Sequence, residues 1–318
     1  MFEAVEFNFL EKRGITLDRS SVALCATQGF NSRVYSAHSN MGEVIVHITK
    51  PIEEQIRQRV WEKMEGVSFI LLKNKELPVA KIIHSERRDD GTFLLVQQKL
   101  LGDPFGKRVL LDGDFVDEWG GPSLSVSTQI ETILATLHSV SVPGFGPIVK
   151  EGKSAKGKYE SWGDFLDTEF PLWLASVATK ETPEFVTQLE SYFATNRSSF
   201  IYDEGSLVHG DATNPSNILG SEGKVTGLID FEWAISGDPA WEFVFNNTYP
   251  LDMYFKERSM STDAQRVFRE RISLYGPIWL TWALHVWVGV EREEATLGYE
   301  ALKKKLSSKD LPKRTSKP

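Results

Sequence analysis

Cysteine is almost absent from this sequence, since Cys25 is the only one among 318 residues. A single cysteine excludes an internal disulfide. The opening segment, MFEAVEFNFLEKRG, also lacks the basic stretch followed by an apolar run that marks a secretory leader. Both absences predict a cytoplasmic protein.

Positive charge is also in short supply. The chain has 36 Lys and Arg against 44 Asp and Glu, a formal net charge of −8 and a pI near 5.4. A nucleic-acid-binding protein presents a basic field, so this balance argues against that class. An acidic surface suits a cationic or neutral small substrate, although mild acidity is also common among soluble proteins.

Long hydrophobic runs are missing too. The most apolar stretch, Tyr275 to Val290, contains Gly276, Pro277, Thr281 and His285. It is shorter than the roughly 20 residues that cross a bilayer, so it predicts a buried helix and no membrane partner. Hydrophobic residues make up 41% of the chain, which is enough for a sizeable core in one bilobal unit or two packed domains.

The first hundred residues have the pattern of a small β-rich lobe. Five β-prone runs, broken by turn residues, cover 22–27, 32–36, 43–49, 79–84 and 92–98. Between the third and fourth, Pro51 begins a predicted helix that extends to about Asn74. We therefore predict a nucleotide-binding lobe over residues 1–100.

A larger lobe, 101–306, follows. After LLGDPF at 101–106 the pattern changes to helical periods, broken by Gly and Pro at 120–122 and 143–147. Helices are predicted over 162–179 and 184–194. The crossover near 99–104 predicts a hinge with a ligand cleft between the lobes, and the polar tail, 307–318, is predicted to be disordered.

The segment LVHGDATNPSNILGSEGKVTGLIDFEWAISGDP, 207–239, carries the chemistry. A short strand ends at Val208, and a second strand returns after the turn GSEG to deliver Asp230. An antiparallel return brings Asp230 towards Asp211 and Asn217. Two carboxylates and an amide then converge.

This convergence suits phosphoryl transfer. Mg²⁺ requires oxygen ligands, which Asp230 and the carboxamide of Asn217 supply. Asp211 is then free to orient an acceptor hydroxyl or amine and take its proton. We expect His209 to brace the loop by hydrogen bonding, and the GDP at 237–239 to cap a helix beneath it.

Several short motifs resemble those of the aminoglycoside phosphotransferase superfamily. They are HGD, the downstream Asn before an apolar pair, and LID followed by the sequence Gly-Asp-Pro. GFNSRVYS, GFGP and SWGDFL are similar in order to segments of the superfamily's hygromycin B phosphotransferase branch. The resemblance extends thinly over most of the chain. It implies a protein-kinase-like α+β fold with a five-stranded amino-terminal lobe and a mainly helical carboxy-terminal lobe, and it implies ATP, or alternatively GTP, with Mg²⁺.

In the amino-terminal lobe, the turn TQGFNSR lies between two strands as a phosphate-covering loop does. The backbone amides of Gly29, Asn31 and Ser32 are candidates to bind nucleotide phosphates. The turn has one glycine, so an ordinary hairpin turn is the alternative. Val96 and Gln98 mark the region whose backbone is expected to contact the adenine ring.

His47 occupies the strand position where kinase-like enzymes carry a Lys or Arg for the phosphates. Alternation places His47 and Ile45 on one face, opposite Val44, Val46 and Ile48. A phosphate-bound cationic imidazole and a plain hydrogen-bonded strand histidine are both open. Glu65 has the spacing at which the resembled family places the acidic partner, and Glu62 is its competitor.

The catalytic loop also departs from the family pattern, because Asp211 and Asn217 are six positions apart where the family has five. Asn214 is therefore an alternative metal ligand. His138 is expected to pack and cap. Glu232, Glu242 and Asp164 are expected to be structural hydrogen-bond partners rather than ligands for a cationic acceptor.

The sequence thus predicts a small-molecule kinase, active as a monomer or homodimer. An aminoglycoside-like antibiotic is the first candidate acceptor, and a metabolite of the choline, homoserine or sugar type is the alternative. A nucleotide-binding pseudokinase without turnover is the rival from another class. A protein-substrate kinase is disfavoured, because HRD, DFG and APE elements are missing.

Overall fold

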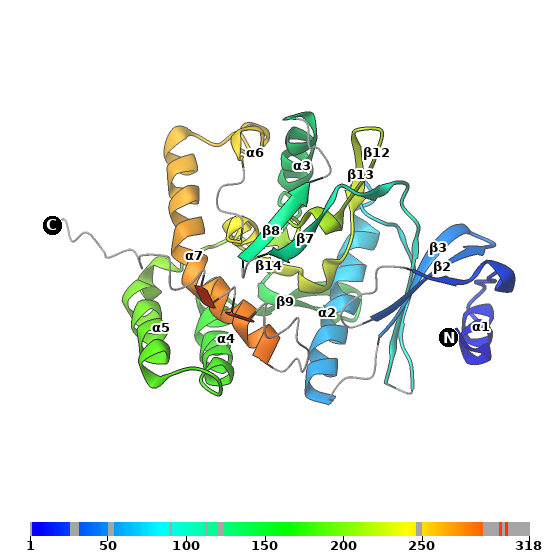
Figure 1. The fold of residues 1–318 in the computed structure, drawn as a ribbon, viewed down its shortest axis with the longest axis horizontal. Coiled ribbons are helices and arrows are strands. Elements are labelled where there is room, and N and C mark those ends of the chain that lie inside the picture. The colour runs from blue at the N-terminus through cyan, green and yellow to red at the C-terminus, as the bar shows by residue number, and fades with distance from the viewer. Residues whose placement is uncertain are drawn as a thin grey trace.

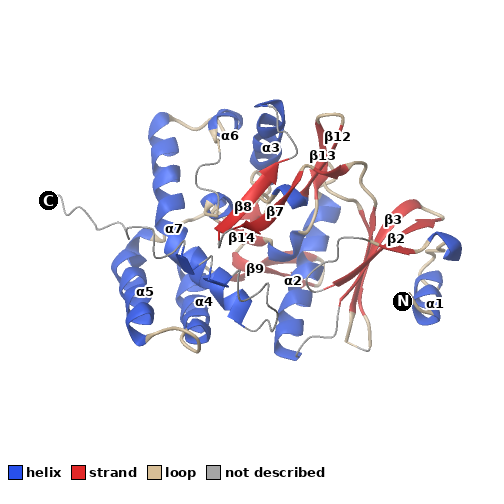
Figure 2. Ribbon diagram, viewed as in Figure 1, coloured by secondary structure: helices blue, strands red, loops and turns tan. Residues whose placement is uncertain are grey.

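The structure is a computed structural model that describes residues 2–25, 32–49, 54–89, 91–111, 114–119, 124–245, 250–288, 299–300 and 303–304. It is a mixed α+β fold in which a β-rich amino-terminal part lies beside a larger part that holds most of the helices (Figures 1 and 2). The predicted fold class is confirmed. The tail over 307–318 lies outside the described residues.

The amino-terminal lobe contains the predicted five-stranded antiparallel sheet, in the order β1-β2-β3-β5-β4. Its strands are β1 (Ala23–Leu24), β2 (Ser32–Ser39), β3 (Gly42–Thr49), β4 (Ile82–Arg87) and β5 (Phe93–Gln98). The predicted helix is α2 (Glu54–Lys73), whose expected start at Pro51 falls outside the described residues. A helix that we did not predict, α1 (Ala4–Glu11), precedes the sheet.

The two faces of this sheet meet different partners. Val44, Val46 and Ile48 are buried with Phe7 and Leu10 in a cluster formed with α1. The predicted alternation in β3 is therefore confirmed, because these three residues share one face. On the other face, Phe93 and Leu95 belong to the main core together with Val67 of α2, which links the sheet to the rest of the molecule.

The carboxy-terminal lobe is less purely helical than predicted. The residues after 106 form a two-stranded sheet, β7 (Gly106–Leu111) with β8 (Asp114–Trp119), so our prediction of helical structure there was wrong. The sequence LLDGD in fact contains an Asp-Gly pair between two short apolar runs, which is a hairpin signal. A four-stranded sheet adds β9 (Phe145–Glu151), β10 (Ser154–Tyr159), β11 (Ser206–Val208) and β14 (Ile235–Gly237).

The helices of this lobe lie on the side away from the five-stranded sheet (Figure 1). They are α3 (Leu124–Leu137), α4 (Trp162–Val177), α5 (Pro183–Asn196), α6 (Asp252–Glu257) and α7 (Thr262–Val288). The helices predicted over 162–179 and 184–194 are confirmed as α4 and α5, and the apolar stretch after Tyr275 is confirmed as part of α7. None of the described helices has the length and hydropathy of a membrane span.

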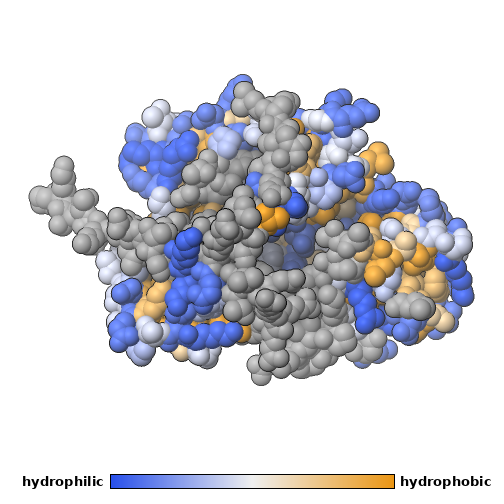
Figure 3. Space-filling view, viewed as in Figure 1, coloured by the Kyte–Doolittle hydropathy of each residue, from blue (hydrophilic) through white to orange (hydrophobic). Residues whose placement is uncertain are grey.

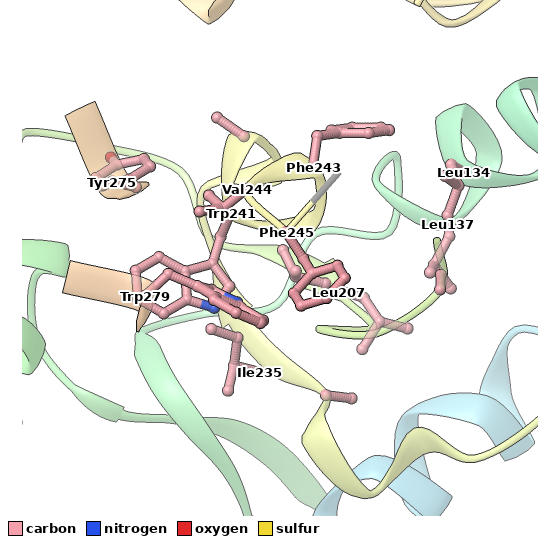
Figure 4. Close-up of a cluster of buried hydrophobic side chains, with 14 of the residues drawn as sticks. Leu134, Leu137, Leu207, Ile235, Trp241, Phe243, Val244, Phe245, Tyr275 and Trp279 are labelled. Carbon is pink, nitrogen blue, oxygen red and sulfur yellow. The ribbon is translucent and has the colours of Figure 1, made fainter. Parts of the chain in front are cut away.

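The residues of the catalytic segment rest on the main core. Leu207 and Ile235, from the paired strands β11 and β14, lie with Trp241 and Phe243 from the 3₁₀-helix η5 (Pro239–Phe243), and α7 contributes Trp279 (Figure 4). All five are at most 7% exposed. The strand ends before and after the catalytic loop are thus anchored in the best-packed part of the protein. Hydrophilic residues, by contrast, cover much of the described surface on the face that Figure 3 shows.

The crossover between the lobes is part of a three-stranded sheet. β6 (Asp103–Pro104) pairs with β12 (Ile218–Ser221), which pairs in turn with β13 (Lys224–Leu228). The chain that leaves the amino-terminal sheet at Gln98 therefore pairs directly with the β12–β13 hairpin.

Candidate active site

One buried carboxylate fixes the backbone of the catalytic loop, residues 209–217, from below. Glu242 in η5 accepts hydrogen bonds from the backbone N–H groups of His209, Gly210 and Ala212, at 2.7, 3.0 and 2.8 Å. Burial raises the pKa of Glu242, but the neighbouring His138, His209 and these N–H groups outweigh it, so its pKa lies below the ordinary value. Glu242 is therefore an anion, and its structural role agrees with our expectation.

The glycine of HGD is needed for the shape of the loop. Gly210 has a φ of +87°, and a Cβ there would lie 2.6 Å from the backbone oxygen of Trp233. Only glycine adopts this conformation without strain, and no side chain fits the space. The loop can therefore turn sharply immediately before Asp211.

His209 joins the loop to the returning strand, as predicted. Its Nδ1 accepts the backbone N–H of Asp211 at 3.3 Å, and its Nε2–H donates to the carbonyl of Ile229 at 2.9 Å. The N–H of Ile229 donates to the carbonyl of Asn217 at 3.0 Å. The β12–β13 hairpin thus returns to the catalytic loop one residue before Asp230.

Both carboxylate oxygens of Asp211 accept hydrogen bonds. Oδ1 accepts from Nη1 of Arg108 at 2.9 Å, and Oδ2 accepts from the side-chain amides of Asn214 and Asn217, each at 3.0 Å. Burial raises the pKa of Asp211, and the Arg108 guanidinium opposes that rise. Asp211 is therefore held in one orientation from three directions.

The two candidate metal ligands, Asn214 and Asn217, differ in what their carboxamide oxygens do. Oδ1 of Asn214 accepts the N–H of Ser216 at 3.1 Å and caps the 3₁₀-turn η3 (Pro215–Asn217). Asn217 donates its amide to the carbonyl and carboxylate of Asp211, each at 3.0 Å. Among the described residues its Oδ1 has no hydrogen-bond partner, so it is available as a ligand.

Asp230 stands at a strained point of the backbone, with φ +68° and ψ +61° in the left-handed region. Asp230 is exposed to solvent at the edge of the site. The protein atoms packed around its carboxylate, together with the negative charges of Glu232 and Asp211, raise the pKa of Asp230 to about 8. Such crowding of negative charge favours a cation at this position.

A family model described as "Phosphotransferase enzyme family" matches residues 26–246, which include β2 to β5 of the five-stranded sheet, the catalytic loop and the β12–β13 hairpin. The chain belongs to this phosphotransferase family. The resemblance inferred from HGD, LID and GDP is thereby confirmed. No curated protein sequence matches the chain.

Solved structures share the fold of this phosphotransferase at low identity. A thermostable mutant of aminoglycoside phosphotransferase APH(4)-Ia, in ternary complex with AMP-PNP and hygromycin B, is 15% identical with a TM-score of 0.67, over 97% of this chain and 99% of that one. Macrolide 2'-phosphotransferase MphH from Brachybacterium faecium is 15% identical with a TM-score of 0.56, over 94% and 96%. The GDP complex of aminoglycoside 2'-phosphotransferase-IIIa is 16% identical with a TM-score of 0.61, over 95% and 97%.

Gly29 and Asn31, two of the residues predicted to bind phosphates, lie outside the described residues. Ser32 is the first residue of β2 and pairs with Thr49 at the end of β3. Val96 and Gln98 lie inside β5, where Val96 pairs with both β3 and β4, and the N–H of Gln98 donates to Lys81 at 2.8 Å. Their contact with a nucleotide base stays a prediction.

His47 lies opposite Leu95 in the β3–β5 register and so shares the face that meets the main core. Nε2 of His47 is 3.3 Å from the side-chain amide of Gln97, and burial lowers the pKa of His47 to about 4. The imidazole is therefore neutral at pH 7 without nucleotide. Glu65, its expected acidic partner, instead pairs with Lys150 of β9 at 2.8 Å, and the side chain of Glu62 is outside the described residues.

Protein stability should report the state of His47. Its pKa of about 4 in the folded chain lies below the ordinary value of about 6.5, so the unfolded chain binds more protons between these values. The stabilising contribution of neutral His47 is complete above about pH 6.5 and is lost as the pH falls towards 4. In urea titrations, His47→Gln should lose less stability than the wild type over this window. Equal losses in the two proteins would contradict the assigned state.

Sequence reasoning missed one residue of the site, Arg108, because the segment that contains it was predicted to be helical. Among the other secondary candidates, His138 is buried with Nδ1 3.0 Å from the Tyr254 hydroxyl, and Asp238 of the Gly-Asp-Pro sequence caps η5 as predicted. Asp164 is exposed in the first turn of α4, and its expected role as a hydrogen-bond partner stays a prediction.

Proposed function

We propose that this phosphotransferase moves the γ-phosphate of ATP to a hydroxyl, or alternatively an amine, of a small polar molecule. The observation that carries the proposal is the environment of Asp211. Its carboxylate is fixed by two amides and a guanidinium, beside the two oxygen donors of Asn217 and Asp230. An aligned, immobile carboxylate is what a general base for an acceptor proton needs.

The residues present fit a magnesium ion. Mg²⁺ is typically held by one or two carboxylates together with substrate phosphates, and it neutralises the charge of those phosphates when bound. Asn217 offers a carboxamide oxygen that has no partner within the described part of the chain, and Asp230 offers a carboxyl group beside Glu232 and Asp211. In the described ranges no group of three or more His, Cys, Asp and Glu residues is placed to hold a metal ion.

Asn217→Ala and Asn214→Ala form a matched pair that tests the metal assignment. Both variants lose one amide hydrogen bond to Asp211 Oδ2, but only the first loses a free carboxamide oxygen. We expect Asn217→Ala to raise the Mg²⁺ concentration for half-maximal activity by about 10-fold, the lower end of the effect of disturbing a metal site, and Asn214→Ala to leave it within a few-fold. Magnesium titrations of the initial rate measure this. The reverse order would make Asn214 the ligand.

For the acceptor, we propose an aminoglycoside-like antibiotic first and a small metabolite second. Two features near Asp211 support a polar molecule with ring faces. Glu232 is a half-buried carboxylate two residues after Asp230, and two half-buried indole rings, those of Trp233 and Trp282, lie 5.1 Å apart. Carboxylates bind amino groups, and indole faces pack against the apolar faces of sugar-like rings.

The experiment that tests the function is a screen of acceptors. Purified protein with ATP and Mg²⁺ is incubated with aminoglycosides, macrolides, amino alcohols and sugars, and mass spectrometry is used to look for the gain of one phosphate. Transfer to any of these establishes the reaction and names its class. If none of the acceptors gains phosphate, melting curves with Mg-ATP test the rival proposal. A pseudokinase gains stability from the nucleotide although it yields no phosphorylated product.

A further inference from the structure

The β7–β8 hairpin places a guanidinium at the centre of the candidate site. Arg108 on β7 lies 103 positions before Asp211 in the sequence, yet its Nη1 is 2.9 Å from Asp211 Oδ1. Its backbone N–H also donates to the hydroxyl of Ser216 in η3, at 3.3 Å. The hairpin therefore contacts the catalytic loop through both the side chain and the backbone of this residue.

The guanidinium is held in place on its other sides. Nε and Nη2 donate to the two carboxylate oxygens of Asp117 on β8, at 2.7 and 3.2 Å. The charged group also stacks on the ring of Phe245 at 3.9 Å. The side chains of Arg108 and Asp117 are only 11% and 12% exposed. A bidentate, stacked and largely desolvated guanidinium has a fixed orientation.

Arg108 still has donors to offer. A guanidinium carries five N–H groups, and the bonds to Asp117 and Asp211 use one each on Nε, Nη1 and Nη2. In the part of the chain that the structure describes, the second N–H on Nη1 and that on Nη2 have no hydrogen-bond partner. An unused N–H beside Asp211 is suited to bind an anion there.

The reaction needs a cation at this place. Negative charge is spread over the oxygens of the transferring phosphoryl group, and enzymes stabilise it with fixed positive groups. The β3 position that supplies a cation in kinase-like enzymes is His47 here, which is neutral without nucleotide. Asp211 adds a carboxylate beside the transferring group. Arg108 is the guanidinium that contacts Asp211.

The distances place Arg108 within reach of the phosphate. An acceptor oxygen that gives its proton to Asp211 lies about 2.6–3.2 Å from the carboxylate, and the phosphorus that it attacks is roughly 3–3.5 Å further on. Nη1 is already 2.9 Å from the same carboxylate. The second N–H on Nη1 is therefore within reach of a γ-phosphate oxygen while the guanidinium keeps its orientation.

We propose that Arg108 is a catalytic residue that binds the γ-phosphate oxygens while the phosphoryl group is transferred. In the step, the bond from the γ-phosphorus to the β,γ-bridging oxygen breaks and its electron pair leaves on ADP. The acceptor oxygen forms the new bond to phosphorus, and its proton passes to Asp211. Arg108 keeps its proton and its charge throughout. This inference rests on the proposed function, because it requires a transferring phosphate.

The experiment compares Arg108→Ala and Arg108→Lys with the wild type. It uses the acceptor found by the screen, or water through Mg-ATP hydrolysis. We expect Arg108→Ala to lower kcat by about 10²- to 10³-fold, as loss of one transition-state donor does, and to change KM for ATP only a few-fold. Guanidinium ion at non-denaturing concentration should restore at least part of the lost kcat in Arg108→Ala. The kcat of Arg108→Lys should lie between those of Arg108→Ala and the wild type, because lysine keeps the positive charge but lacks the planar set of N–H donors of a guanidinium.

Arg266→Ala serves as the control, because Arg266 forms an exposed ion pair with Glu270 on α7. It should match the wild type with and without guanidinium. A kcat for Arg108→Ala within about 3-fold of the wild type would overturn the inference, as would a loss that guanidinium does not relieve. Failure of the wild type to transfer phosphate to any acceptor or to water would instead refute the proposed function. If Arg108→Ala does not fold, the same comparison of kcat and KM in Arg108→Lys decides the matter.

Discussion

Asp211→Asn is expected to abolish phosphoryl transfer and to leave nucleotide binding close to that of the wild type. A positioned general base contributes about 10²- to 10⁴-fold to a rate, and the amide cannot accept the acceptor proton. The substitution keeps the size of the side chain, and one oxygen can still accept from the amides of Asn214 and Asn217. Initial rates with the identified acceptor measure the loss, and the shift in melting temperature with Mg-ATP measures binding.

Asp203→Asn is the matched control, because Asp203 is an exposed aspartate on the approach to β11 in the same lobe. It should keep both the rate and the shift in melting temperature. Turnover by Asp211→Asn at more than about a tenth of the wild-type rate would remove Asp211 from the role of base. Loss of the Mg-ATP shift together with the rate would show that the change had damaged nucleotide binding instead.

Glu242→Ala is expected to lower the free energy of unfolding by about 3–5 kcal/mol and to inactivate what remains folded. Three buried backbone N–H groups, those of His209, Gly210 and Ala212, would lose their acceptor in a part of the protein that water does not reach. Urea unfolding measures the stability. The activity of the folded fraction measures how far Asp211 has lost its position.

Glu242→Gln is a milder test of the same role. The amide nitrogen of the new side chain would replace one carboxylate oxygen and could not accept the N–H that faces it. We expect an intermediate loss of stability and a reduced kcat with little change in KM for ATP. Glu184→Gln, at an exposed glutamate in the first turn of α5, is the control and should be neutral. Full stability of Glu242→Ala would mean that the three N–H groups find another partner and that Glu242 does not fix the loop.

The order of the elements could be predicted well because their signals are local. Alternating apolar residues and turn residues identified the five-stranded sheet, and α2, α4 and α5 followed from periodicity and Gly or Pro punctuation. The β7–β8 hairpin was predicted wrongly. Its runs, such as Val109 to Leu111, are too short for periodicity to separate strand from helix, and the Asp-Gly pair between them was overlooked.

Parts of the site were harder to predict from the sequence. The spacing from Asp211 to Asn217 left open which of two asparagines is the better candidate for a metal ligand. Their hydrogen bonds differ in the folded chain, because Oδ1 of Asn214 accepts the N–H of Ser216 whereas Asn217 donates its amide to the carbonyl of Asp211. The pairing of Glu65 with Lys150 could not be foreseen, because the two residues are 85 positions apart. A pattern of spacings gives no information about which distant charge will be nearest in the folded chain.

The sequence alone determined the family, the fold class and the identities of Asp211, Asn217 and Asp230 as candidates, because a short hairpin encodes their relative positions within a few residues. The tertiary structure alone decided which groups surround them: Glu242 beneath the loop and Arg108 beside the carboxylate. The physical reason is the range of each interaction. Turn and strand preferences act between near neighbours, whereas burial, charge and hydrogen-bond satisfaction depend on every segment that packs against the site.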